Sequence, residues 1–237
     1  MHSAPDVNLA ILSAAARYLG DLVDDVVFVG GAAAGLLITD PASGPVRVTR
    51  DIDVITAVAT HLEFHRLAGR LRELGFSEDQ SDDAPICRMV RDEVILDVMP
   101  TDARVLGFGN PWYPAAFENA LLHELPNGQT IRLISAPYFL ATKFVAFESR
   151  GNADFLASPD LEDIITVIDG RAEIVDDVAG SAADLRRFLS EKIHSMLDSE
   201  HFLDALPGHL PGAFDSPGRY PVVMGRLEAI AEGDTEP

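Results

Sequence analysis

Cysteine, basic residues and long apolar runs are scarce in this sequence of 237 residues. Cys87 is its one cysteine, which excludes an intrachain disulfide and a zinc site built from cysteines, and fits a reducing compartment. No apolar run reaches the roughly 18–20 residues of a membrane-spanning helix, and the first residues lack the basic region of a signal peptide. We therefore expect a cytoplasmic protein that has no membrane partner.

The small number of basic residues limits how this protein could bind nucleic acid. Lysine and arginine together number 18 against 38 aspartates and glutamates, which gives a formal net charge of −20. Such a charge repels phosphates and excludes a broad nucleic-acid-binding surface, so any contact with nucleic acid would have to be local. Hydrophobic residues make up 47% of the chain, which is enough to build a core.

Periodicity and turn residues predict strands and helices in the first part of the chain. The expected elements are, in order, a helix over 8–22, a strand running into Gly30-Gly31, a helix over 32–38, a strand over 47–58, a helix over 61–75, two strands around the turn at Arg91-Asp92-Glu93, and a strand over 127–135. This order predicts an α+β (α/β) catalytic domain over residues 1–134, with a mixed sheet and helices packed on it.

Strand patterns stop near residue 135. Four helical stretches follow, separated by loops rich in proline and glycine. We expect a helical C-terminal domain over 135–232 and a frayed tail over 233–237.

The segment RVTRDIDVITAV, which starts at Arg47, concentrates charge. Read as a strand, it places Arg47, Thr49, Asp51 and Asp53 on one face. The two carboxylates, roughly 6.6 Å apart along the strand, repel each other unless they share a proton or hold a cation. Asp97 adds a third acid inside an apolar strand, where an unpaired charge would be costly. Three carboxylates make an oxygen-only site that suits Mg²⁺.

Gly30 and Gly31 supply the next element of the expected site. They follow a strand and precede a helix, so the backbone can approach a phosphate closely. A Gly-Gly pair alone marks a structural turn about as often, but its combination with Asp51-Ile52-Asp53 and Asp97 is specific. We expect these three acids to hold two Mg²⁺ ions, for which Mn²⁺ can substitute, while an acceptor hydroxyl attacks the α-phosphate of a nucleoside triphosphate (NTP).

These elements, in this order, resemble the DNA polymerase β nucleotidyltransferase superfamily. The fuller resemblance is to the AbiEii-type, MenT-like nucleotidyltransferase toxins. It rests on RVTRDID, on GFGNPWYPAAFENA and on KFVAFESRGNADFLASPDLEDI, and it covers about residues 25–170. The spacing from Gly31 to Asp51 is longer than the superfamily pattern, so we expect TDPASGPVR to loop away from the site.

The resemblance implies a polymerase β-like catalytic domain followed by a helical half. It also implies a toxin that transfers a nucleotide from an NTP such as ATP or CTP to the 3′ end of tRNA, with a cognate antitoxin as partner. Within the last block it implies that Lys143 is needed for activity, together with Asp160 or Asp163. Asp160 also stands in a good helix start, Ser158-Pro159-Asp160, so the choice between the two acids stays open.

Helical and strand geometry add residues that could bind the nucleotide. Lys143 and Arg150 are seven residues apart and share a helix face that could meet a triphosphate. Arg47 and Thr49 could contact phosphate from the strand that carries the acids. The predicted catalytic residues are Asp51, Asp53, Asp97, Lys143 and Asp163, and the predicted nucleotide-binding residues are Gly30, Gly31, Arg47, Thr49, Lys143, Arg150 and Asp160.

Two other functions remain as alternatives. A dinucleotide-binding fold would also place glycines after a strand, but Ala32 stands at the second glycine position of its motif and the repeated βαβ units are missing. A non-catalytic, nucleotide-binding regulatory protein could keep the same fold. The acceptor stays open as well: the net charge requires tRNA to be held by a small basic surface around Arg47, Arg50, Lys143 and Arg150, and a protein or a small molecule is the alternative.

Overall fold

The computed structural model describes residues 7–151, 154–210 and 218–233, and the chain forms two compact units. The sheet unit comprises residues 1–36 and 48–135, and the helical unit comprises residues 37–47 and 136–237. After the segment 37–47, the helical unit resumes at residue 136, one residue after the start of the helical domain predicted from the sequence. The segment 37–47, which the sequence places in the first domain, belongs to the helical unit.

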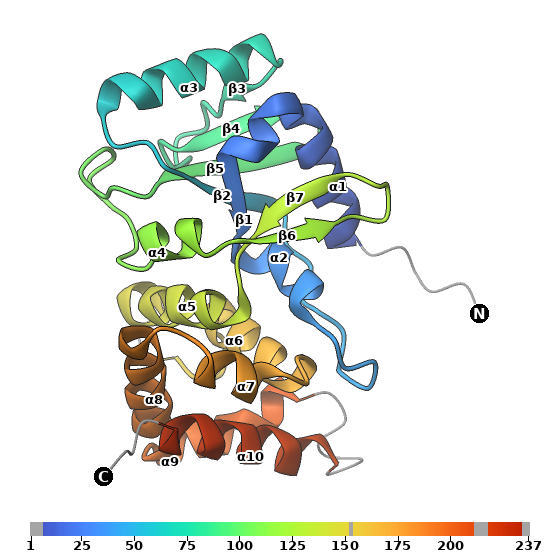
Figure 1. Ribbon diagram of the computed structural model, residues 1–237, viewed down its shortest axis with the longest axis vertical. Helices are drawn as coiled ribbons and strands as arrows, with labels where there is room; N and C mark the ends of the chain where they lie inside the picture. The colour runs from blue at the N-terminus through green and yellow to red at the C-terminus, as the bar shows by residue number, and fades with distance from the viewer. Residues whose placement is uncertain (1–6, 152–153, 211–217, 234–237) are drawn as a thin grey trace. The chain divides into compact units, whose positions relative to one another are not determined.

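The described residues of the sheet unit form seven strands, and Figure 1 labels its strands and α-helices. They are α1 (Val7–Leu19), the 3₁₀ helix η1 (Gly20–Asp25), β1 (Val26–Val29), α2 (Gly30–Leu37), β2 (Asp51–Thr56), α3 (His61–Glu73), β3 (Ser77–Glu78), β4 (Arg88–Arg91), β5 (Val94–Pro100), α4 (Tyr113–Glu118), β6 (Leu121–Glu124) and β7 (Thr130–Leu133).

The strands form one mixed sheet in the order β3-β4-β5-β2-β1-β7-β6. β2 pairs in parallel with β5, and β1 in parallel with β7, whereas the other neighbours are antiparallel. This topology confirms the predicted mixed sheet with helices. The turn predicted in the β4–β5 hairpin is also confirmed, and Asp92 adopts a positive φ of 52° there.

The two faces of the central strands differ sharply in chemistry. Along β2, Ile52 and Val54 are fully buried, whereas Asp51 and Asp53 on the other face are half-buried. Helix α1 packs against β2 and β5, and α3 begins with a capping box at Thr60 and Glu63. The apolar face of the strands is therefore the one suited to helix packing, and the acidic side chains lie on the other face.

The strand predicted over residues 47–58 is wrong at its start, because β2 begins at Asp51. Arg47 and Thr49 precede the strand and do not extend its acidic face. The short elements β3, α4, β6 and the helix α7 of the helical unit were not predicted from the sequence. Each has at most six residues, too few for a periodic pattern to stand out.

The helical unit confirms the predicted helical second half. Its helices are α5 (Ala136–Arg150), α6 (Pro159–Gly170), α7 (Ile174–Ala179), α8 (Ala183–Leu197), α9 (Glu200–Ala205), the 3₁₀ helix η2 (Leu206–His209) and α10 (Arg219–Glu232). The backbone amides of Thr39 and Asp40 donate to the carbonyl of Gly170 at 2.9 and 2.8 Å, which ties the segment 37–47 to α6. Apart from Gly233, the predicted frayed tail lies outside the described residues.

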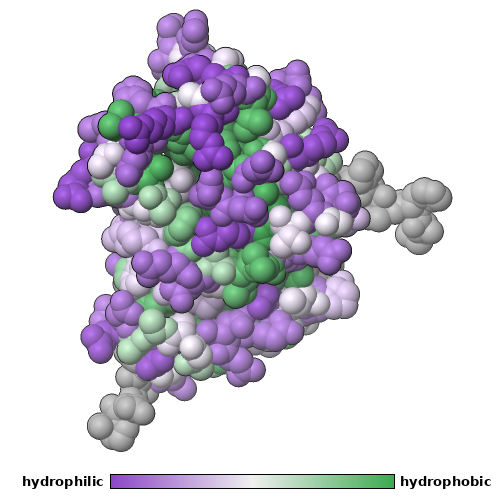
Figure 2. Space-filling view, turned by 45° about the horizontal axis from the view of Figure 1, so that its top comes forward, coloured by the Kyte–Doolittle hydropathy of each residue, from purple (hydrophilic) through white to green (hydrophobic). Residues whose placement is uncertain are grey.

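Hydrophilic side chains cover much of the face drawn in Figure 2, with hydrophobic side chains between them. This surface agrees with the excess of acidic residues in the composition. Among the described helices, none combines the length and the apolar character that a membrane span requires.

Candidate functional site

The three predicted acids lie on one face of two adjacent strands. Asp51 and Asp53 belong to β2, Asp97 belongs to β5, and the parallel register sets Asp53 directly opposite Asp97. Neighbouring strands are roughly 4.8 Å apart, so these two carboxylates are held as near neighbours by the backbone itself. The sheet thus places three negative charges on one face of two adjacent strands.

Arg88 on β4 provides a positive charge that the sequence reading missed. It lies directly opposite Asp97 in the antiparallel β4–β5 pair. Its Nε donates to Asp97 Oδ1 at 2.8 Å, and its Nη2 donates to Asp97 Oδ2 at 2.7 Å and to Asp51 Oδ2 at 3.0 Å. These charge-assisted bonds, above all those to Asp97, raise the pKa of Arg88 still further, so it is permanently charged.

A signal for Arg88 was present in the sequence. Once Asp92 and Glu93 form the tip of the hairpin, Arg91 pairs with Val94, and counting back along both strands pairs Arg88 with Asp97. The hairpin register therefore identifies the counterion of the third acid.

Gly30 leaves the space that Asp53 occupies. It adopts a positive φ of 70°, and a Cβ atom at this position would lie 1.9 Å from Asp53 Oδ2. Gly31 follows it, buried, in the first turn of α2. The predicted Gly-Gly element and the predicted acid are therefore in direct contact range.

The donor set fits a hard cation such as Mg²⁺ by chemistry and by position on one face. All three donors are carboxylates, and 40% of the Asp51 side chain is exposed against 10% of Asp97. Within residues 7–151, 154–210 and 218–233, however, no three His, Cys, Asp or Glu side chains are grouped to hold a metal ion. Arg88 instead binds two of the acids, so a metal ion would have to replace it.

Cys87, next to Arg88, takes no part in this chemistry. Its side chain is buried, and burial together with the negative charge of Asp97 raises the pKa of the thiol to about 12. The thiol therefore stays neutral, which excludes it as a nucleophile near neutral pH.

The other predicted residues form a charged cluster inside the helical unit. Lys143 on α5 is buried, and its Nζ lies 3.0 Å from Asp160 Oδ1 and 2.6 Å from Asp163 Oδ2. Arg150, on the same face of α5 as predicted, donates from Nε to Asp160 Oδ2 at 2.8 Å. Lys143 is thus shared by two carboxylates on the first turns of α6.

Asp160 and Asp163 differ in their surroundings. The Ser158 side chain accepts a hydrogen bond from the amide of Leu161, so the predicted helix start is confirmed. Burial alone would raise the pKa of the Asp160 carboxyl, but Arg150 and Lys143 outweigh it, and the net shift is downward. Asp163 is more deeply buried, with 1% of its side chain exposed.

Arg47 and Thr49 lie where the sequence did not place them. Arg47 belongs to the helical unit, where its Nη2 donates to Asp163 Oδ2 at 3.0 Å. A buried carboxylate such as Asp163 is costly without a countercharge, which explains why Arg47 pairs with it. Thr49 is buried, and its amide donates to Asn8 Oδ1 at 2.9 Å.

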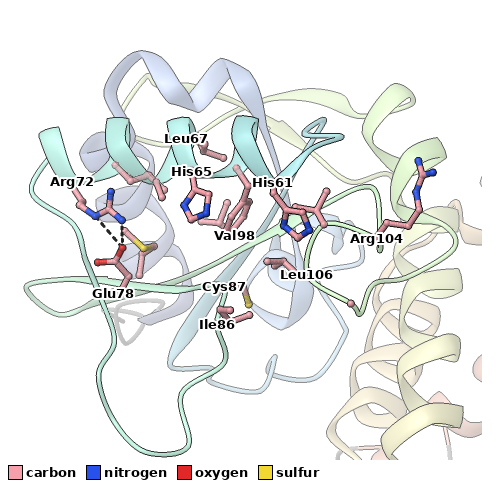
Figure 3. Close-up of a pocket in the computed structure, with 16 residues that line it drawn as sticks. His61, His65, Leu67, Arg72, Glu78, Ile86, Cys87, Val98, Arg104 and Leu106 are labelled. Atoms are coloured by element: carbon pink, nitrogen blue, oxygen red, sulfur yellow. Dashed lines mark hydrogen bonds and ion pairs between the residues drawn. The ribbon is translucent and has the colours of Figure 1, made fainter.

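A pocket of about 530 Å³ lies on the other face of the sheet (Figure 3). His61 and His65 project into it from α3, and Met89 and Val98 line its sheet side. Along β4 and β5 these two residues alternate with Arg88 and Asp97, so they point away from the acidic face. The pocket contains none of the predicted site residues.

Comparison with known proteins identifies the fold. No family model and no curated protein sequence matches the chain. The crystal structure of an antigenic nucleotidyltransferase-like protein from Paracoccidioides brasiliensis is similar, with a TM-score of 0.55 and 21% identity, over 85% of this chain and 94% of that one. A nucleotidyltransferase candidate from H. pylori has a TM-score of 0.51 and 11% identity, over 97% and 96%. The chain therefore has a nucleotidyltransferase-like fold.

Proposed function

We propose that this chain is a nucleotidyltransferase that depends on a divalent cation and moves a nucleoside monophosphate from an NTP to an acceptor hydroxyl. The observation that carries the proposal is the packing of Gly30 against Asp53, with Asp97 opposite Asp53 on the next strand. A glycine without room for a Cβ, beside paired carboxylates on a nucleotidyltransferase-like fold, supports a phosphate-binding turn next to a cation site.

Each residue of the acidic face has a role in the proposed reaction. Asp51, Asp53 and Asp97 would hold Mg²⁺ or Mn²⁺, and Gly30 and Gly31 would let the triphosphate approach the backbone. A bound divalent ion supplies a Lewis acid for the α-phosphate and charge neutralisation for the pyrophosphate. The acceptor oxygen forms a bond to the α-phosphorus, the bond from that phosphorus to the bridging oxygen breaks, and pyrophosphate leaves.

An acceptor hydroxyl reaches Asp51 more easily than Asp97, because the Asp51 side chain is 40% exposed. We propose that it lies nearest the attacking hydroxyl and receives its proton, directly or through water. Asp97, 10% exposed, is better placed to anchor the cation.

Lys143, Asp160 and Asp163 would support activity indirectly, because their ion pairs hold the helical unit in its folded arrangement. Loss of the lysine would leave Asp160 and Asp163 facing each other without one of their counterions. We therefore propose that the requirement implied by the toxin resemblance reflects positioning by Lys143 and Asp163, with Asp160 and Arg150 completing the cluster.

The toxin resemblance makes the 3′ end of tRNA our first proposed acceptor, with a cognate antitoxin as partner. The net charge of −20 and the ion pairs already made by Arg47, Lys143 and Arg150 favour a second candidate, a protein or small-molecule hydroxyl. Arg47 and Lys143, expected to hold tRNA, are bound to Asp163. Such neutralised cations release few counterions from an RNA backbone.

One experiment tests the activity and the acceptor together. The chain is incubated with Mg²⁺ and each α-³²P-labelled NTP, in parallel with total cellular RNA, with a soluble protein extract and with a small-molecule fraction. The control is the double variant Asp51→Ala/Asp53→Ala. Label in tRNA that depends on the acids supports the tRNA proposal, and label in protein or in a small molecule supports the second candidate. No transfer in any fraction contradicts the proposed function.

A further inference from the structure

Arg88 occupies the position that a cation would take among the acids. It uses both Asp97 oxygens and Asp51 Oδ2, all within 3.0 Å. Its side chain is 22% exposed, so the ion pairs are partly sheltered from water. The contact follows from strand register, because Arg88 and Asp97 are direct partners across β4 and β5.

A divalent ion and Arg88 compete for the same oxygens. Both are attracted by the same carboxylates, and a unit positive charge beside a divalent ion is repelled by it at short range. An arginine cannot relieve this repulsion by losing its proton. Metal binding therefore requires the guanidinium to move away from Asp51 and Asp97.

An NTP gives the displaced guanidinium a new partner. Its fork of N–H donors matches phosphate oxygens as well as carboxylate oxygens. The Arg88 side chain remains on the acidic face because the register of β4 fixes that face.

We propose that Arg88 is a partner-exchanging residue. In the chain without nucleotide it neutralises Asp51 and Asp97, and when an NTP arrives with its metal ion it moves to the triphosphate. The inference rests on the proposed function. Arg88 should therefore weaken the binding of metal alone and strengthen the binding of nucleotide with metal, two effects of opposite sign.

The test compares Arg88→Met with Arg91→Met. Arg91 is on the same strand but on the other face, where it lies over the Tyr18 ring at 4.0 Å and donates to the carbonyl of Leu74. Mn²⁺ binding without nucleotide is measured by electron paramagnetic resonance. Binding of α,β-methylene NTP analogues is measured by calorimetry in the presence of Mg²⁺. Neither measurement requires turnover.

For Arg88→Met we expect Mn²⁺ to bind more tightly by a factor on the order of 10, and the nucleotide analogue to bind more weakly by a similar factor. Arg91→Met should leave both affinities near those of the wild type. If Arg88→Met is too unstable to purify in the absence of metal, its melting temperature in rising Mn²⁺ replaces the titration, and it should rise more than that of Arg91→Met.

Unchanged or weaker Mn²⁺ binding by Arg88→Met would show a fixed structural ion pair and overturn the inference. Tighter Mn²⁺ binding with unchanged nucleotide affinity would overturn the exchange as well. The metal titration is independent of catalysis. Opposite shifts in the two affinities without any label transfer would therefore sink the proposed function while leaving the partner exchange of Arg88 intact.

Discussion

Gly30 and Asp53 exclude any side chain between them, since a Cβ atom at residue 30 would stand 1.9 Å from Asp53 Oδ2. The same glycine has a φ of 70°, in the region that residues with side chains rarely adopt. Two independent constraints, backbone conformation and contact, thus require glycine at the point where the first strand meets the acidic face.

Replacing Gly30 by alanine should destabilise the chain by at least about 2 kcal/mol, because the left-handed conformation and the contact with Asp53 both oppose a Cβ. Gly69→Ala is the matched control. It lies in α3 with no atom within 4 Å of an added Cβ, so alanine should be neutral or stabilising there. Urea unfolding of both variants measures the difference, and equal stabilities would refute the strained contact.

The Lys143 cluster should matter for stability. Lys143→Met leaves Asp160 and Asp163 with less countercharge in the interior of the helical unit, and we expect a loss of about 3 kcal/mol. Arg150→Met removes a cation whose side chain is 70% exposed, so the expected loss is below about 1 kcal/mol. Chemical denaturation monitored by circular dichroism separates the two, and a Lys143→Met variant as stable as wild type would argue for a lysine free to serve another role.

The contribution of Asp160 should depend on pH. Its pKa in the folded chain lies below the ordinary value of 3.8, so the folded state favours the ionised carboxylate. The resulting stability is fully present above pH 3.8 and is lost as the pH falls through the lower folded-state value. The difference in unfolding free energy between wild type and Asp160→Asn should therefore be constant near neutrality and shrink in acid. A difference that grows as the pH falls would contradict the pairing.

The acids and glycines of the sheet unit could be predicted because their positions depend on local chain geometry. A two-residue period fixes the common face of Asp51 and Asp53, and the parallel pairing of β2 with β5 sets Asp97 opposite Asp53 on that face. The pairing of Arg88 with Asp97 was also predictable from the sequence, by counting residues back from the hairpin turn.

Arg47 could not be placed by local rules. Its partner Asp163 is 116 positions away in the chain. The ion pair with this buried carboxylate decides the position of Arg47, and not the alternating strand pattern of RVTRDID. The assignment of 37–47 to the helical unit is non-local as well, since its bonds go to residues of α6 and α10.

The central claim is that the acidic face transfers a nucleotide. The most direct measurement compares Asp53→Asn with Asp92→Asn for NTP-dependent, Mg²⁺-dependent formation of labelled acceptor and pyrophosphate. Asp92 is an exposed residue at the tip of the β4–β5 hairpin, which carries Asp97, and its φ of 52° suits asparagine. We predict that Asp53→Asn lowers the rate by a factor on the order of 10²–10³ and that Asp92→Asn keeps the wild-type rate. Transfer by Asp53→Asn at the wild-type rate would contradict the account.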